Sequence, residues 1–177
     1  MAQLYLIQNT TGTTTAAPVK QPTGTAIRTM LQVALSSTFP AARVVEWGCS
    51  FDGSAAATPG EIELVETGTV FATVSTASAV GDIIPWNDPN APANTSGSSG
   101  VPFNLGTALT GFATASGTEG SITATREFDS QLIAPTNQYV KQFPLGREPE
   151  LKPGNCLRIR VTFGASVNMY CYVIIEV

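Results

Sequence analysis

The side chains that could do catalytic chemistry in this sequence are carboxylates, because the chain of 177 residues contains no histidine. Histidine is the commonest general base, so its absence excludes Ser-His-Asp and Cys-His mechanisms within this chain. A glycosidase needs two carboxylates across a cleft. The closely spaced pair Glu61 and Glu63 alternates with apolar residues, as charges do on the solvent face of a strand. We therefore expect the chain not to be an enzyme.

Cysteines and loop carboxylates are the remaining candidates for a metal or cofactor site. The three cysteines, Cys49, Cys156 and Cys171, form no Cys-x-x-Cys spacing, and we interpret them as small buried side chains in a reducing compartment. Asp82 and Asp88 could offer oxygen ligands to calcium, but their spacing matches no calcium loop. No glycine-rich phosphate loop occurs. We expect no metal and no cofactor.

Charge argues against nucleic acid as a partner. The chain has 9 basic and 13 acidic residues, for a net charge of −4. The basic residues are scattered, and Arg158 with Arg160 is their one close cluster, whereas binding to phosphate backbones needs a dense basic surface. No run approaches the roughly 18 apolar residues that span a bilayer, and the first residues do not read as a signal peptide. We expect neither a nucleic-acid nor a membrane partner, and synthesis in a cytoplasm.

The elements that must position any site are strands. Hydrophobic residues make up 43% of the chain and charged residues 12%, and glycine and proline number 16 and 12. This composition, rich in threonine and valine, predicts one all-β domain over residues 1–177. Alternating apolar and polar side chains predict strands near residues 4–8, 27–35, 43–52, 61–66, 121–128, 138–143, 156–163 and 167–177. Residues 67–80 fit a strand or a short helix, so we expect an antiparallel, jelly-roll-like sandwich or barrel of about eight to nine strands.

The last two predicted strands look like a hairpin closed by residues 164–166. The expected pairing places Leu157 opposite Val173, Arg158 opposite Tyr172 and Arg160 opposite Tyr170. Both arginines would then lie on exposed tyrosine rings, a cation–π arrangement. In this register Cys156 does not face Cys171, so we expect no disulfide between them.

Two segments are too rich in threonine, proline, serine and glycine to form regular elements. Residues 9–26 read as an extended arm that becomes ordered on a neighbour, and residues 81–106 as one long loop. A loop of that length is usually functional or held by a partner. Trp86 within it is either an anchor in its own domain, which we favour, or a contact residue.

Several sequence segments resemble small virion proteins of tailed bacteriophages that decorate or cement the outside of the head. They are WGCSFDG at 47–53, PWNDPNAP at 85–92, PTNQYV at 135–140, FPLGREPE at 143–150 and LRIRVT at 157–162. The resemblance implies a jelly-roll-like domain that binds the major capsid protein lattice, as a homotrimer, on the outer surface of the head. It also implies synthesis in the host cytoplasm and no catalytic residues.

Residues that could contact such partners lie in the arm, the long loop and the last two strands. They are Thr13, Thr14, Thr15, Pro18, Trp86, Asn87, Asp88, Arg158, Arg160, Tyr170 and Tyr172. The alternative is a carbohydrate-binding or adhesion module of a phage tail fibre or spike, since Trp86 beside Asp88, or the two tyrosines, could bind sugars. A shell protein that packages RNA is discounted, because Lys20 is the only basic residue before Arg28.

Overall fold

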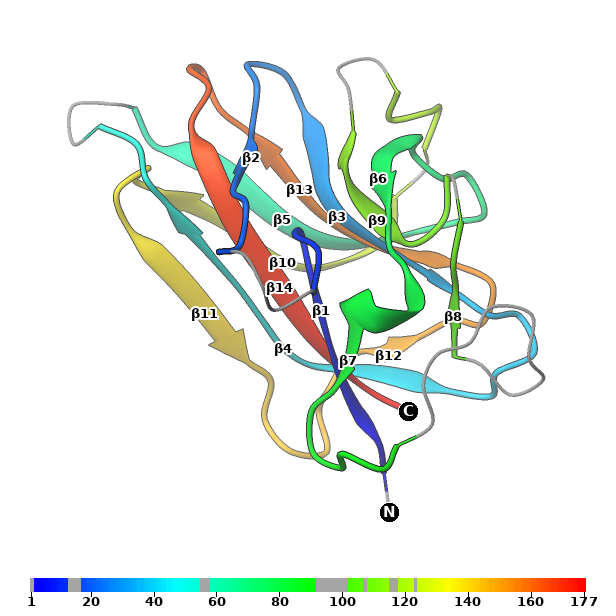
Figure 1. Cartoon of the computed structure of the whole chain (residues 1–177). Coiled ribbons are helices and arrows are strands. Elements are labelled where there is room, and N and C mark those ends of the chain that lie inside the picture. Colours follow the sequence, from blue (N-terminus) through cyan, green and yellow to red (C-terminus); the bar gives the residue numbers. More distant parts are fainter. Residues whose placement is uncertain are drawn as a thin grey trace.

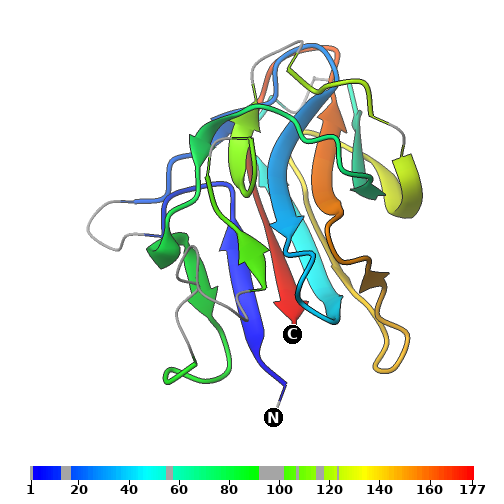
Figure 2. The ribbon, with the colours of Figure 1, turned by 90° about the vertical axis from the view of Figure 1, so that its right-hand side faces the viewer.

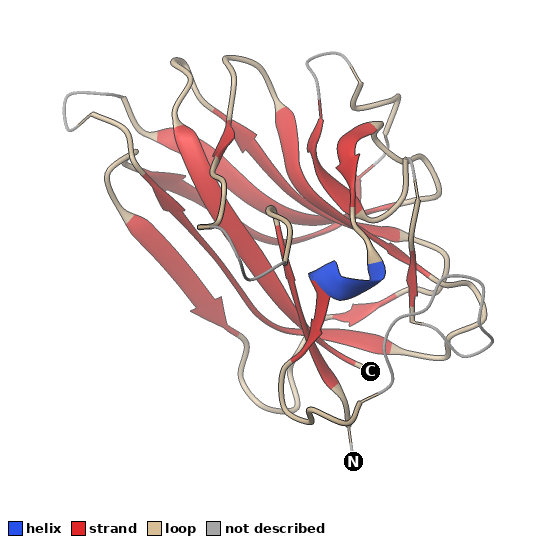
Figure 3. Ribbon diagram, in the orientation of Figure 1, coloured by secondary structure: helices blue, strands red, loops and turns tan. Residues whose placement is uncertain are grey.

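The chain is an all-β protein built of two antiparallel sheets that face each other (Figures 1 and 2). The computed structural model describes residues 2–12, 17–54, 58–91, 102–106, 108–114, 118–122 and 124–177. Figure 3 shows how strands dominate this part of the chain. The all-β prediction is confirmed. Of the two expected architectures, the sheets are stacked and do not close into a barrel.

Sheet A holds seven of the described strands, in the order β11-β4-β14-β1-β7, with β12 beside β4 and β2 beside β14. Its strands are β1 (Leu4–Gln8), β2 (Gln21–Pro22), β4 (Ala42–Phe51), β7 (Ile83–Pro85), β11 (Gln138–Gln142), β12 (Glu150–Leu151) and β14 (Asn168–Glu176). Figure 1 shows β11 and β7 at its two edges.

Sheet B holds the other seven described strands, in the order β10-β5-β13-β3-β9-β6, with β8 beside β3. Its strands are β3 (Arg28–Leu35), β5 (Gly60–Thr67), β6 (Val74–Ala77), β8 (Phe103–Asn104), β9 (Gly111–Thr114), β10 (Ala124–Ile133) and β13 (Cys156–Thr162). A short 3-10 helix, η1 (Val80–Asp82), leads into β7.

The core lies between the two sheets, because every second side chain of the long strands is apolar and faces inward. Trp47 of β4, Val173 of β14 and Ile159 of β13 are at most 1% exposed. On the side where β10 and β11 are edge strands, Asp129 of β10 links the sheets. Its Oδ2 accepts hydrogen bonds from Nε1 of Trp47 at 3.2 Å and from the hydroxyl of Tyr139 at 2.7 Å.

Each predicted strand overlaps a strand of the structure, but the number of strands differs. The described residues form fourteen strands, because short pairings such as β2 and β12 carry too few residues to show an alternating pattern. The prediction of a loop without regular elements over residues 81–106 was wrong in part, since this segment contains β7 and β8. Pro85 is compatible with a strand here because it ends an edge strand, where no partner needs its missing N–H.

The predicted C-terminal hairpin was wrong. β13 pairs with β3 and β5 in sheet B, while β14 pairs with β1, β2 and β4 in sheet A. Residues 164–166 therefore cross from one sheet to the other. The alternating patterns of the two strands match because both fill the same core from opposite sides. Cys171 instead lies opposite Cys49 of β4, and all three cysteines are free and buried.

The arm is anchored to its own sheet near both of its ends. Asn9 is fully buried, and its side chain donates to the carbonyl of Met169 at 3.1 Å and accepts the N–H of Cys171 at 2.8 Å. Further along, β2 adds to β14, and buried Thr23 accepts the N–H of Val167 at 3.1 Å. Composition did not predict this anchoring, because it depends on hydrogen bonds between the side chains of two polar residues, Asn9 and Thr23, and backbone groups of residues 167–171.

Candidate binding face

The outer face of sheet A carries two tyrosines within a grid of polar side chains, which we call the tyrosine face. Strand register fixes its rows, and the side chains alternate with the buried Trp47, Cys49, Cys171 and Val173. Its members are Gln8 from β1, Glu46, Gly48 and Ser50 from β4, Gln138, Val140 and Gln142 from β11, and Tyr170 and Tyr172 from β14. The middle row runs Gln8, Tyr172, Gly48, Val140.

Tyr172 forms the centre of this face. Its ring lies across strand β4 over Gly48, where a β-carbon would stand 2.7 Å from Cε1 of the ring. Its hydroxyl donates to Oε1 of Glu46 at 2.5 Å. Partial burial, and then this hydrogen bond, raise the pKa of Tyr172 above its ordinary value, so the phenol stays neutral. The neighbouring Tyr170 donates to the side-chain oxygen of Gln8.

A shallow hollow adjoins the tyrosine face at the top of β4 and β11. It has a volume of about 480 Å³ and is lined by Ser50, Phe51, Thr136, Asn137 and Gln138. A second hollow of about 280 Å³ lies beside it, between residues 52–54 and 165–168. Hydroxyl and amide groups therefore dominate this end of the sheet.

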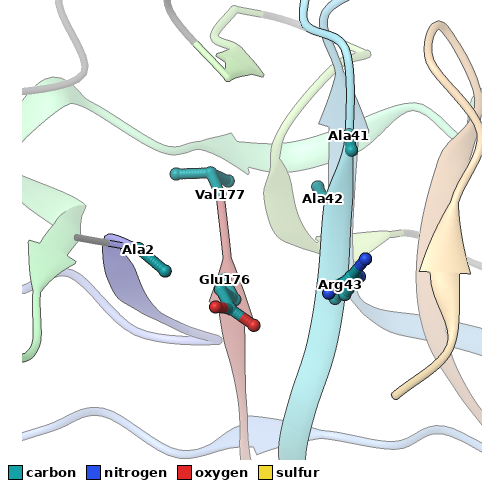
Figure 4. A pocket seen from close by; sticks show the side chains of 6 residues that line it. All are labelled: Ala2, Ala41, Ala42, Arg43, Glu176 and Val177. Carbon is teal, nitrogen blue, oxygen red and sulfur yellow. The ribbon is translucent and has the colours of Figure 1, made fainter. Parts of the chain in front are cut away.

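The hollow at the opposite end of sheet A is small. It has a volume of about 120 Å³ and lies between the ends of β1, β14 and β4 (Figure 4). Arg43 and Glu176 line it and are opposite each other in the strand register. Ligand pockets typically measure roughly 300–1,000 Å³, so this hollow suits only a few waters.

The residues singled out in the long loop have separate roles. Trp86 is 57% exposed rather than anchored in its own domain, contrary to the interpretation favoured above. Asn87 holds the start of β1, accepting the N–H of Leu4 at 2.8 Å and donating to the carbonyl of Ala2 at 2.9 Å. Asp88 accepts the N–H of Asn90 at 2.9 Å, an ordinary turn contact.

The arginines do not join the tyrosines. Arg158 is fully buried on the outer side of sheet B, where it contacts Glu119 at 3.4 Å and the carbonyl of Val70. Arg160 pairs with Glu63 at 3.0 Å. The predicted exposed cation–π pairs were therefore wrong, because β13 and β14 belong to different sheets. In the arm, Pro18 is exposed, while Thr13, Thr14 and Thr15 lie outside the described residues.

Carboxylates that could have offered metal ligands are used to hold loops. Asp82 accepts the N–H of Gly12 at 2.5 Å and that of Ala79 at 2.8 Å. Among the described residues, no group of three or more His, Cys, Asp or Glu side chains is placed to hold a metal ion. In the same part of the chain, no helix is long and apolar enough to cross a membrane.

Exposed apolar side chains occur on or next to edge strands β10 and β11, where Leu132 faces outward from sheet B and Val140 faces outward from sheet A. Leu132 of β10 is 76% exposed, Val140 of β11 is 52% exposed, and Leu145 is 97% exposed. Leu145 stands in the tight turn after β11, in which Arg147 donates its N–H to the carbonyl of Pro144 at 2.8 Å. These two sheet edges, with their exposed apolar side chains, are therefore the candidate contact region for another chain.

Comparison with known protein families, with curated proteins and with solved structures finds no match to this chain.

Proposed function

We propose that the chain is a structural virion protein that decorates or cements the head of a tailed bacteriophage. It binds the lattice of the major capsid protein as a homotrimer, on the outer surface of the head. The observation that carries this proposal is that edge strands β10 and β11, with the turn after β11, hold the exposed apolar side chains of Leu132, Val140 and Leu145. The sequence resemblance supplies the identity of the partner.

We further assign the sandwich to the jelly-roll class. Numbered along the chain, the eight strands of five or more residues run 1-8-3-6 in sheet A and 2-7-4-5 in sheet B. Jelly rolls have eight strands in two sheets connected as two Greek keys, and they occur in viral capsid proteins and in lectins. Because the fold supports both roles, the surfaces must decide between them.

The β10–β11 side offers two ways to hold a neighbour. Among the described strands, β11 pairs only with β4, which leaves its other edge free to accept a strand of an adjacent chain. Leu132 and Leu145 add apolar surface, and burying such a side chain stabilises a contact by about 1.5–3 kcal/mol. Weak single contacts of this kind suffice on a repeating lattice, because a trimer engages several sites at once.

Sedimentation velocity of the purified chain, alone and mixed with capsid shells, tests this proposal. We expect trimers that co-sediment with shells, and monomers with little shell binding for the double variant Leu132→Ser, Leu145→Ser. Val70→Ser is the matched control, because Val70 is 43% exposed but lies over β13, two strands away from edge strand β10. A chain that stays monomeric and never associates with shells would overturn the proposal.

A further inference from the structure

We infer that the tyrosine face binds a neutral saccharide, with one pyranose ring stacked on Tyr172. This activity differs from the proposed capsid binding, since it uses the broad face of sheet A, whereas capsid binding uses Leu132, Leu145 and the free edge of β11; Val140 lies where the two surfaces meet. A decoration protein with such a face would carry a sugar-binding site on its exposed surface.

The stacking surface is built into the sheet. The Cε1–Cζ edge of the Tyr172 ring lies against Gly48, and the hydroxyl is held by Glu46, so the ring has a fixed position on the sheet and stays partly exposed. A flat ring suits the apolar C–H face of a pyranose, because the negative face of the aromatic quadrupole attracts the weakly positive C–H groups. Exposed Val140, in the same row, extends the apolar strip.

Polar groups around the ring match the hydroxyls of a sugar. Gln138 and Gln142 are exposed and carry amides that both donate and accept, while partly exposed Ser50 adds a hydroxyl. Glu46 is the only charged residue among the members of the face. An anionic glycan would meet this carboxylate without a compensating cation, so the ligand is neutral.

The adjoining hollow gives the site its length. It shares Ser50 and Gln138 with the tyrosine face and adds the exposed Thr136 and Asn137. Its volume of about 480 Å³ falls within the range of small-molecule sites. A short oligosaccharide stacked on Tyr172 would therefore place its next residue among hydroxyl and amide groups.

The test is saturation-transfer NMR and calorimetry with neutral linear trisaccharides of glucose, galactose and mannose. We expect at least one to bind, and Tyr172→Ala to weaken that binding at least tenfold. Tyr172→Phe, which keeps the ring, should lose no more than about threefold. Gln138→Ala, at an exposed position, should weaken binding severalfold without altering the unfolding temperature. Trp86→Ala is the control, since this exposed aromatic ring lies beyond the tyrosine face, and it should bind as the parent does.

Two results would overturn the inference. One is no binding by any of the three sugars, and the other is equal binding by the parent, Tyr172→Ala and Gln138→Ala. If no sugar binds and Tyr172→Ala loses capsid-shell binding, the face is a protein contact. Failure of shell binding with sugar binding intact would instead count against the proposed capsid role alone.

Discussion

Gly48 of β4 lies directly beneath the ring of Tyr172 of β14. A β-carbon at Gly48 would stand 2.7 Å from Cε1 of that ring and 3.0 Å from the carbonyl oxygen of Tyr139. Glycine is thus required at position 48, because any side chain there would be too close to the Tyr172 ring and to the Tyr139 carbonyl of the neighbouring strand β11. The missing side chain at Gly48 lets the Tyr172 ring extend across β4, and the candidate sugar site depends on it.

Gly48→Ala should destabilise the fold by about 1–3 kcal/mol, the range for overpacking a well-packed site. The side-chain ring can move, but the carbonyl of Tyr139 belongs to the strand ladder and cannot. Chemical denaturation measures the change. Gly164→Ala is the control, because nothing lies within 4 Å of its β-carbon position, and a stability change there as large as at Gly48 would contradict this account.

Arg158 holds the outer layer of sheet B in place. Its fully buried guanidinium contacts the carboxylate of Glu119, which also accepts the N–H of Thr29 at 2.6 Å and the hydroxyl of Thr114 at 2.8 Å. Arg158→Met should lower the free energy of unfolding by about 3 kcal/mol, because removing one partner leaves buried polar groups without hydrogen bonds.

The matched control for Arg158 is Arg43→Met. Arg43 pairs with Glu150 at 3.8 Å, and both side chains are at least half exposed, so the loss should stay below about 1 kcal/mol. If urea unfolding gave equal losses for the two variants, Arg158 would not be the anchor described here.

The cysteines should be unreactive in the folded protein. Burial raises the pKa of Cys49 and of Cys156 to about 12, and that of Cys171 well above its ordinary value. Since the thiolate is the reactive form, we expect no labelling by iodoacetamide at pH 8 until denaturant is added, and then three labels by mass spectrometry. Rapid labelling of any cysteine under native conditions would contradict the packing of the core.

The arm should loosen in acid. A hydrogen bond from Lys20, at 2.5 Å, is the main cause that lowers the pKa of Asp52. A lowered pKa means that this contact stabilises the fold fully above the ordinary carboxyl pKa of about 3.9. The contribution is lost as pH falls through the lower, folded value. NMR shifts of Lys20 should therefore stay constant from pH 7 to 5 and change only below about pH 4, and a change near neutral pH would refute the pairing.

Alternation along the chain located the long strands well but not their partners. Glu46, Gly48 and Ser50 could be assigned to one face of a strand from sequence, yet only the register shows that Tyr172 lies across Gly48. The wrong prediction of a hairpin has the same origin. The alternating pattern shows which side chains of β13 and β14 face the core, but it is the same whether the two strands pair in one sheet or lie in two facing sheets. Arg158 was expected at the surface because no local pattern signals that Glu119, 39 residues away, covers it.

An image reconstruction of the virus particle whose genome encodes this chain tests the central claim most directly. The account predicts density for the sandwich at repeated positions on the outside of the head, with the β10–β11 side against neighbouring subunits. A head without this density, or a chain found only away from the particle, would contradict it.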